Sequence, residues 1–366
     1  MAELNGASRF ERSDRDEGTS TTEFSPLRVG VLGVGRIGRL HAELLAHDVA
    51  GAALVAVCDP RRGRARAVAE DLGARVSASA EELIRDPEVK AVGICSSTDT
   101  HAKLVIEAAA AGKAIFCEKP VSLDLAELDR ALEAVAEARV PFQVGFNRRF
   151  DPSHESVRNA VASGSIGEPH LVRISSRDAV PPPLDYVRVS GGIFLDMTIH
   201  DFDLARYVTG SDVVEVFARG ALRIDPSFAE ADDVDTAMVV LMHRNDCLTA
   251  IDNSRGAAYG YDQRVEAFGS RGMARSWNPP AHTAAIELAE GTWTPALAES
   301  PLERYRRSYV REWEAFVTAV RSGSEPPVTR ADARAPLVIG LAAQRSLREG
   351  RALTVSEAEA AGCATR

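Results

Sequence analysis

The segment LRVGVLGVGRIGRLHAELL constrains the fold most, because it places a glycine-rich turn between an apolar strand pattern and a helical one. Val29 and Val31 lie in the apolar run, and the leucines after the turn recur at helical spacing. Gly33, Gly35 and Gly38 form the pattern G-x-G-x-x-G. Such a turn lets a pyrophosphate approach amides at a helix N-terminus, where the helix dipole favours negative charge. The alternative is a turn that serves only tight packing between strand and helix.

A second apolar run, ALVAVCDP, ends in Asp59 about twenty residues after the turn. A carboxylate at this position accepts the ribose hydroxyls of a dinucleotide. It also favours NAD, because its charge repels the 2′-phosphate of NADP. Arg61 and Arg62 follow closely and would bind that phosphate if Asp59 turned away. We therefore expect NAD as the cofactor, with NADP as the alternative.

Strand and helix patterns alternate as far as Phe146 and predict an α/β fold, in which an N-terminal Rossmann domain has a doubly wound parallel sheet. Its ligand crevice should lie at the carboxyl ends of the strands. Later segments such as DTAMVVLMHR alternate apolar and polar residues, which predicts a C-terminal α+β domain with a large, mostly antiparallel open sheet. The predicted parts are a disordered extension (1–26), the dinucleotide-binding domain (27–147), a substrate-binding and oligomerisation domain (148–352) and a frayed C-terminal tail (353–366).

Charge and apolar content exclude several classes of protein. The formal net charge of −10 over 366 residues argues against a nucleic-acid partner, which needs a basic surface. No apolar run approaches the roughly 18 residues of a membrane span, and the polar start is no secretory signal. The cysteines form no C-x-x-C pair, and they are Cys58, Cys95, Cys117, Cys247 and Cys363. Together these features predict a cytoplasmic protein with reduced thiols and no membrane association.

The tripeptide EKP, Glu118 to Pro120, comes at the end of a predicted strand and so at the edge of the expected crevice. Lys119 could donate there to a substrate hydroxyl or carbonyl and stabilise charge during hydride transfer. Position alone leaves open a surface lysine before a proline turn.

The second candidate for chemistry is GGIFLDMTIHDFDLARYVTG, in which Asp196 and His200 are four residues apart. On one helix they would share a face, and the carboxylate would orient the imidazole and tune its pKa. A structural helix pair or an N-cap remains the alternative. No HExxH pattern or third ligand accompanies this pair, so we expect no metal site. Of Asp201 and Asp203, we expect one to cap or bind and the other to be solvated.

Together these motifs resemble the Gfo/Idh/MocA oxidoreductases, which carry the glycine turn, the EKP strand end and a D-x-x-x-H helix in this order. The resemblance runs from residue 28 to about residue 350. The segments FCEKPVSLDL, SGGIFLDMTIHDFDLAR and AIDNSRGAAYGYDQRVEAFGS are similar to the inositol-oxidising members of that family.

The resemblance implies a set of site residues. The catalytic residues would be Lys119, Asp196 and His200. The dinucleotide would be held by Gly33, Gly35, Arg36, Ile37, Gly38, Asp59, Ser97, Thr98, His101, Glu118 and Lys119. The substrate would meet Lys119, Arg149, Asp196, His200 and Tyr259. Arg149 could instead bind a helix end at the surface, and Tyr259 could be an ordinary packing residue beside Gly260.

The activity implied is NAD-dependent oxidation of a ring carbinol in a cyclic polyol, with myo-inositol giving 2-keto-myo-inositol. His200 would take the hydroxyl proton, Asp196 would orient His200, and Lys119 would stabilise the developing oxyanion. A dehydrogenase of another inositol or of a sugar is the second hypothesis, and a dinucleotide-binding sensor without turnover is the third. The resemblance also implies a homotetramer.

Overall fold

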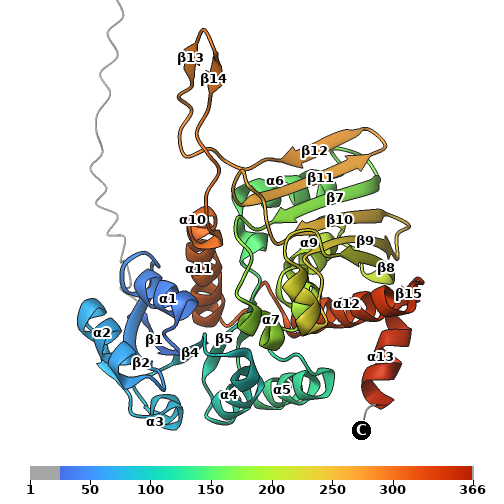
Figure 1. The fold of residues 1–366 in the computed structure, drawn as a ribbon. Helices are drawn as coiled ribbons and strands as arrows, with labels where there is room; N and C mark the ends of the chain where they lie inside the picture. The colour runs from blue at the N-terminus through green and yellow to red at the C-terminus, as the bar shows by residue number, and fades with distance from the viewer. Residues whose placement is uncertain (1–24, 365–366) are drawn as a thin grey trace, which may run out of the picture.

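The computed structural model describes residues 25–364, and the predicted N-terminal extension lies almost wholly outside them. Two domains are arranged one above the other in Figure 1, with the N-terminal domain in blue to teal. None of the helices in the described part of the chain is long and apolar enough to cross a membrane.

The first domain is built on a six-stranded sheet in the order β3-β2-β1-β4-β5-β6, in which all neighbouring strands are parallel. Its strands are β1 (Leu27–Leu32), β2 (Ala52–Cys58), β3 (Arg75–Val76), β4 (Ala91–Ile94), β5 (Ala114–Glu118) and β6 (Phe142–Gly145). Its helices are α1 (Arg36–His47), α2 (Arg62–Leu72), α3 (Ala80–Arg85), α4 (Thr98–Ala110) and α5 (Leu125–Ala138). This strand order is that of a doubly wound dinucleotide-binding fold, as predicted.

The second domain contains a seven-stranded sheet in the order β12-β11-β7-β10-β9-β8-β15. Its strands are β7 (Pro169–Arg177), β8 (Val213–Ala221), β9 (Thr236–His243), β10 (Leu248–Ser254), β11 (Asp262–Gly269), β12 (Gly272–Ser276) and β15 (Leu353–Thr354). Only β7 and β10 pair in parallel, so the prediction of a mostly antiparallel sheet is confirmed.

One face of this sheet is covered by helices and the other is open. Along β9, Ala237, Val239 and Leu241 are buried, whereas Met238 and Val240 are exposed, which is the alternation expected of a one-sided sheet. The connecting helices and 3-10 turns are η1 (Asn147–Phe150), α6 (Pro152–Ala162), α7 (Leu184–Ser190), α8 (Gly192–Asp196), α9 (Ile199–Thr209), η2 (Pro226–Ala231), α10 (Pro301–Arg304), α11 (Arg306–Ser322), α12 (Arg330–Glu349) and α13 (Val355–Ala364). A hairpin of β13 (Ile286–Leu288) and β14 (Gly291–Trp293) stands away from the body in Figure 1.

Helix α11 returns to the first domain and packs into its core. The Trp313 ring stacks on Phe116 of β5 with centroids 4.1 Å apart, and it lies 3.2 Å from where a Cβ on Gly93 would stand. A segment beyond residue 300 therefore completes the core of the N-terminal sheet. The domain limits given by the sequence stay a prediction.

The prediction of a frayed tail over 353–366 is wrong for its described part. β15 pairs with β8 through Leu353 and Thr354, and the Leu353 side chain is fully buried. Glu357 then accepts hydrogen bonds from the backbone and hydroxyl of Thr354, which fixes the start of α13. Burial and edge pairing thus order a segment whose composition alone indicated a loose end.

Candidate active site

The glycine turn between β1 and α1 has the geometry of a dinucleotide cradle. Gly33 has φ +84°, and a Cβ there would lie 2.4 Å from the Cα of Ser96. A Cβ on Gly38 would lie 1.9 Å from the Gly33 carbonyl oxygen. Gly35 is different, because its nearest neighbour would be an Arg64 nitrogen at 3.7 Å. Gly33 and Gly38 are thus required for the turn and for close packing, and Gly35 leaves the turn open where a pyrophosphate would approach.

Asp59 directly follows β2 and lies beside this turn. Its carboxylate accepts hydrogen bonds from the backbone N–H of Val34 at 3.0 Å and of Arg61 at 2.8 Å. These bonds fix the carboxylate next to the glycine turn, and Arg64 approaches the same oxygen that Val34 binds, at 3.6 Å. The side chains of Arg61 and Arg62 are exposed. Asp59 does not turn away, so its charge stays where a ribose would bind, and this geometry fits NAD.

The other predicted cofactor residues divide into two groups. Arg36 and Ile37 begin α1, and Ser97 and Thr98 begin α4, so their amides lie at helix N-termini. His101, by contrast, is buried, and its ring nitrogens contact the carbonyl oxygens of Pro120 (2.9 Å) and Ser96 (3.0 Å). It joins the ends of β4 and β5 rather than presenting a free ring.

Glu118 is likewise held within the protein. His41 Nε2 contacts Glu118 Oε1 at 2.7 Å, and the Trp313 indole N–H donates to His41 Nδ1 at 2.8 Å. Since Nδ1 accepts, Nε2 carries the proton and donates to the carboxylate. Glu118 Oε2 accepts from the backbone N–H of Lys119 at 3.2 Å. This buried chain of bonds supports the backbone that carries Lys119.

Lys119 follows the carboxyl end of β5 and joins the two domains, as expected for a residue at this end of the parallel strands. Its Nζ donates to the backbone oxygen of Asp196 at 2.7 Å and lies 3.6 Å from Asp196 Oδ1. Both side chains are largely buried, at 15% exposure each. The predicted catalytic lysine and aspartate therefore lie in direct contact across the interface between the domains.

The prediction that Asp196 and His200 share one helix is wrong. Asp196 ends α8, Met197 and Thr198 interrupt the helix, and His200 lies in α9. The Thr198 hydroxyl donates to Asn253 Oδ1 at 2.6 Å, which ties the interruption to β10. No hydrogen bond joins Asp196 to His200. The Asp196 carboxylate accepts instead from Tyr186 (Oδ1, 2.8 Å) and from Arg255 (Oδ2, 3.2 Å).

His200 is held neutral by its surroundings. Burial lowers its pKa well below the ordinary value, and the positive charges of Lys119 and Arg148 lower it further. Its Nδ1 is buried and has no hydrogen-bond partner among the described residues. The ring meets Phe146 edge-on at 6.0 Å between centroids. A neutral imidazole keeps a nitrogen lone pair free, which a general base requires.

Of two adjacent arginines, Arg148 acts electrostatically on His200, and it is not the arginine that was predicted to meet the substrate. Arg149 binds Asp203 (2.6 and 2.8 Å) and Asp332 (2.8 Å), and its side chain is only 10% exposed. Arg148 binds Asp201 and is close enough to lower the pKa of His200. The assignment of Arg149 to the substrate is corrected accordingly. The expectation of one solvated aspartate is wrong too, because Asp201 and Asp203 are both buried in these ion pairs.

The neighbouring tyrosines Tyr259 and Tyr261 also differ, because the predicted one is exposed and the other is buried. Tyr259 is 52% exposed, and its hydroxyl contacts Arg177 and Asp262, so it is not brought to Lys119. Tyr259 and Met238 line a hollow of about 740 Å³. Met238 is an exposed residue of the open face of the second sheet. Tyr261 is the buried member of the pair, at 4% exposure, and lies within electrostatic range of Arg148, Asp178 and Asp201.

Asp178, directly after β7, is a site residue that sequence analysis missed. Burial raises its pKa to about 6, and the charge of Asp196 adds to the rise, while Arg255, Arg148 and Lys119 oppose it. These interactions place its carboxylate among the groups around Lys119. The signal in the sequence was an acidic residue at a strand's carboxyl end, in SSRDAVPPP.

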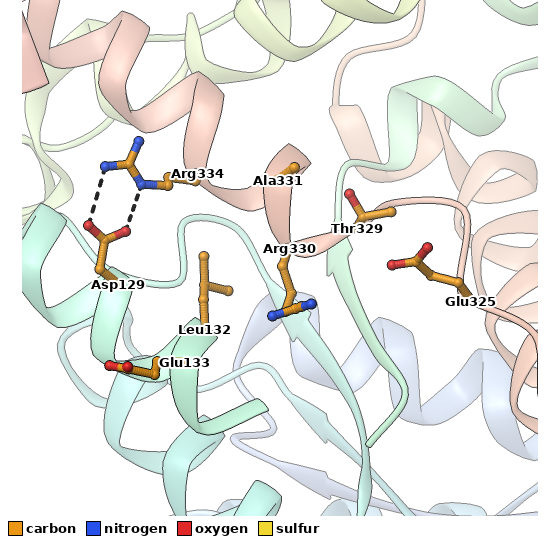
Figure 2. A pocket seen from close by; sticks show the side chains of 8 residues that line it. All are labelled: Asp129, Leu132, Glu133, Glu325, Thr329, Arg330, Ala331 and Arg334. Carbon is orange, nitrogen blue, oxygen red and sulfur yellow. Dashed lines mark hydrogen bonds and ion pairs between the residues drawn. The ribbon is translucent and has the colours of Figure 1, made fainter. Parts of the chain in front are cut away.

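A separate surface notch, shown in Figure 2, lies between α5 and the start of α12 and has a volume of about 370 Å³. Arg334 spans it to bind Asp129 at 2.7 Å. The residues that line it are Asp129, Leu132, Glu133, Glu325, Thr329, Arg330, Ala331 and Arg334. None of these belongs to the cluster around Lys119, so the notch is not the candidate active site.

Known protein families and proteins that are similar to this chain agree with this geometry. Residues 27–146 match the Gfo/Idh/MocA oxidoreductase family with its NAD-binding Rossmann fold, and residues 154–275 match the Gfo/Idh/MocA C-terminal domain. The chain is 49% identical over 332 residues to a myo-inositol 2-dehydrogenase of Thermotoga maritima, covering 90% of this chain and 99% of that protein. It is 42% identical over 330 residues to an inositol 2-dehydrogenase of Rhizobium meliloti, covering 90% and 99% respectively.

Among solved structures, a scyllo-inositol dehydrogenase from Lactobacillus casei with bound NAD(H) and scyllo-inositol matches with a TM-score of 0.85 at 28% identity. The match covers 90% of this chain and 99% of that one. The chain therefore belongs to the Gfo/Idh/MocA family of oxidoreductases, and its first domain is the NAD-binding domain of that family.

Proposed function

We propose that the protein oxidises myo-inositol at a ring carbinol to 2-keto-myo-inositol, with NAD as hydride acceptor. The observation that carries the proposal is the contact of Lys119, at the edge of the NAD-binding sheet, with Asp196 of the second domain. His200, held neutral, lies within range of the same ammonium. The names and activities of the inositol dehydrogenases that resemble this chain supply the substrate class.

The residues that would hold NAD are the glycine turn, Asp59 and the N-terminus of α4. Bound at these residues, NAD would supply the nicotinamide ring that accepts the hydride. His200 takes the proton of the carbinol hydroxyl as the carbon is oxidised. The Lys119 ammonium stabilises the negative charge that develops on the oxygen. Asp196 contacts Lys119 rather than His200, so its role in this mechanism is to hold the ammonium in position.

Polar side chains around Lys119 support a substrate with many hydroxyl groups. Asp178 lies within electrostatic range of Lys119 and Arg148, and Tyr261 lies within range of Arg148 and Asp178. A buried polar group left unpaired by an inverted or missing hydroxyl costs substantial binding energy. A sibling activity on scyllo-inositol, a chiro-inositol or a sugar is the second candidate, since the same groups can pair with other patterns of hydroxyls.

The test is a panel of substrates, in which the rate of NADH or NADPH formation is measured by absorbance. Purified protein is assayed with NAD or NADP and with myo-inositol, scyllo-inositol, chiro-inositol and glucose. The proposal predicts the highest kcat/KM for myo-inositol with NAD. A higher value for another substrate would transfer the assignment to that sibling activity. Tight NAD binding without turnover of any of them would favour a dinucleotide sensor.

We also propose a cytoplasmic homotetramer. The open face of the second sheet exposes large apolar side chains between 37% and 54%, namely Met238, Val240, Leu248, Phe268 and Met273. An apolar sheet face of this kind is commonly covered by another subunit. The cysteines Cys58, Cys95, Cys117 and Cys247 are free, as in a reducing compartment. Light scattering at micromolar concentration should give four times the mass of the chain, and a monomer would contradict the assembly.

A further inference from the structure

The two oxygens of the Asp196 carboxylate accept hydrogen bonds from different side chains, and neither of these side chains has a role in the mechanism above. Arg255, 1% exposed, binds Oδ2 and also lies 3.7 Å from Asp233. Asp233 in turn accepts from the backbone N–H of Ile193 at 3.0 Å, at the start of α8. Arg255 therefore belongs to the internal support of the helix that ends in Asp196.

The other support comes from α7, which follows the stiff PPP segment. The Tyr186 hydroxyl donates to Asp196 Oδ1 at 2.8 Å, and this is the oxygen that faces Lys119 Nζ at 3.6 Å. About half of Tyr186 is exposed, yet the hydroxyl points inward to the carboxylate. Burial raises the pKa of Tyr186 above its ordinary value, and the Asp196 charge raises it further, so the hydroxyl remains a proton donor throughout the working pH range.

We infer that Tyr186 is a positioning residue for the reaction, which holds Asp196 Oδ1 where the carboxylate keeps the Lys119 ammonium directed at the substrate oxygen. This inference rests on the proposed function. Without the Tyr186 hydroxyl, the carboxylate keeps the Arg255 bond on its other oxygen and the 3.6 Å ion pair with Lys119, but no hydrogen bond fixes Oδ1 in place. A hydrogen bond to a charged group is strong enough for its loss to be visible in the rate.

The charge of Arg36, at the start of α1, acts on the ionisation of Tyr186. A direct role in holding NAD is therefore a distinct outcome that the test must separate. If Tyr186 acts through Asp196, its hydroxyl affects turnover and leaves the affinity for NAD unchanged. If it holds NAD, its loss raises the Kd for NAD in the absence of any substrate.

The kinetic test is a double-mutant cycle with Tyr186→Phe and Asp196→Asn, using Val189→Ala as the matched control. Val189 is 68% exposed on the same helix. We expect Tyr186→Phe to lower kcat for myo-inositol about tenfold, with unchanged Kd for NAD and unchanged Tm. In the Asp196→Asn background the same change should have a smaller effect, because the amide oxygen accepts only a weaker, uncharged hydrogen bond from the tyrosine. Equal losses in both backgrounds, or a raised Kd for NAD, would overturn the inference.

A second readout does not depend on the substrate. The only lysines are Lys90, Lys103, Lys113 and Lys119, so reductive ¹³C-methylation gives few NMR signals, and Lys119→Arg assigns the relevant one. Tyr186→Phe should shift the Lys119 signal and leave the other three unchanged, whereas Val189→Ala should move none. A Lys119 signal that does not respond to Tyr186→Phe would overturn the inference. Failure of myo-inositol as a substrate would overturn the proposed function alone.

Discussion

The Lys119 ammonium donates to the backbone oxygen of Asp196 at 2.7 Å, and this bond joins the edge of the NAD-binding sheet to the end of α8. Lys119 follows β5, whereas Asp196 belongs to the second domain. A contact between residues this far apart in sequence makes the geometry of the candidate site depend on how the two domains pack. Trp313 of α11 contributes to that packing from inside the first domain.

Replacement of Lys119 by arginine should abolish most turnover even though the positive charge is kept. The guanidinium fork is larger than an ammonium and spreads its charge over a plane, so it does not fit between the Asp196 carbonyl and the substrate oxygen. We expect kcat to fall at least about a hundredfold. The Kd for NAD, measured by fluorescence, should not change. Wild-type turnover in Lys119→Arg would remove this residue from the mechanism.

His200→Ala should lower kcat by at least about a hundredfold through loss of the general base. The pH profile of the wild type offers a second check. Because the pKa of His200 is well below its ordinary 6.5, the ring stays unprotonated as the pH falls through that value. The kcat at saturating substrate should therefore stay level between about pH 8 and 6.5. An inflection at pH 6.5 would show a histidine with an unshifted pKa and contradict the account.

Arg149→Met should affect stability rather than substrate binding. The change leaves Asp203 buried without its partner and removes a bond to Asp332. Breaking a buried ion pair on one side costs about 3–5 kcal/mol, which urea unfolding can measure. The KM for myo-inositol should be unchanged in the protein that folds. A raised KM with wild-type stability would restore the role in substrate binding that the sequence indicated.

Asp59→Asn should relax the preference for NAD. The amide keeps one oxygen for a backbone N–H but loses the charge that repels a 2′-phosphate. We expect the Kd for NAD to rise about tenfold, and the Kd for NADP to fall. Isothermal titration with each dinucleotide measures both values. A variant that still excludes NADP would show that Asp59 does not set the preference.

The parts of the site that follow a regular pattern could be predicted from the sequence. The G-x-G-x-x-G turn predicted the cradle, because the steric demands on Gly33 and Gly38 are local. The strand end before Lys119 could be predicted as well, since β5 is a continuous buried run. These features depend on a few adjacent residues and on the order of the strands.

The errors arose where the backbone departs from a regular period. The helix predicted to hold Asp196 and His200 is interrupted at Thr198, which bonds to β10, a strand distant in sequence. Tyr259 and Tyr261 flank Gly260, which has φ +114°, and Tyr259 is exposed whereas Tyr261 is buried. Nothing in the letters RR indicates which arginine of the 3-10 turn pairs with Asp201 and which pairs with Asp203.

The most direct measurement is hydride transfer from a labelled substrate. The protein is incubated with NAD and with myo-inositol that carries deuterium on the carbinol carbon, C2, and the reduced dinucleotide is analysed by mass spectrometry. We expect NADH that is one mass unit heavier than with unlabelled myo-inositol, formed by the wild type and almost absent with His200→Ala. Reduced dinucleotide without the label, or none at all while NAD remains bound, would contradict the proposal that this site oxidises the carbinol.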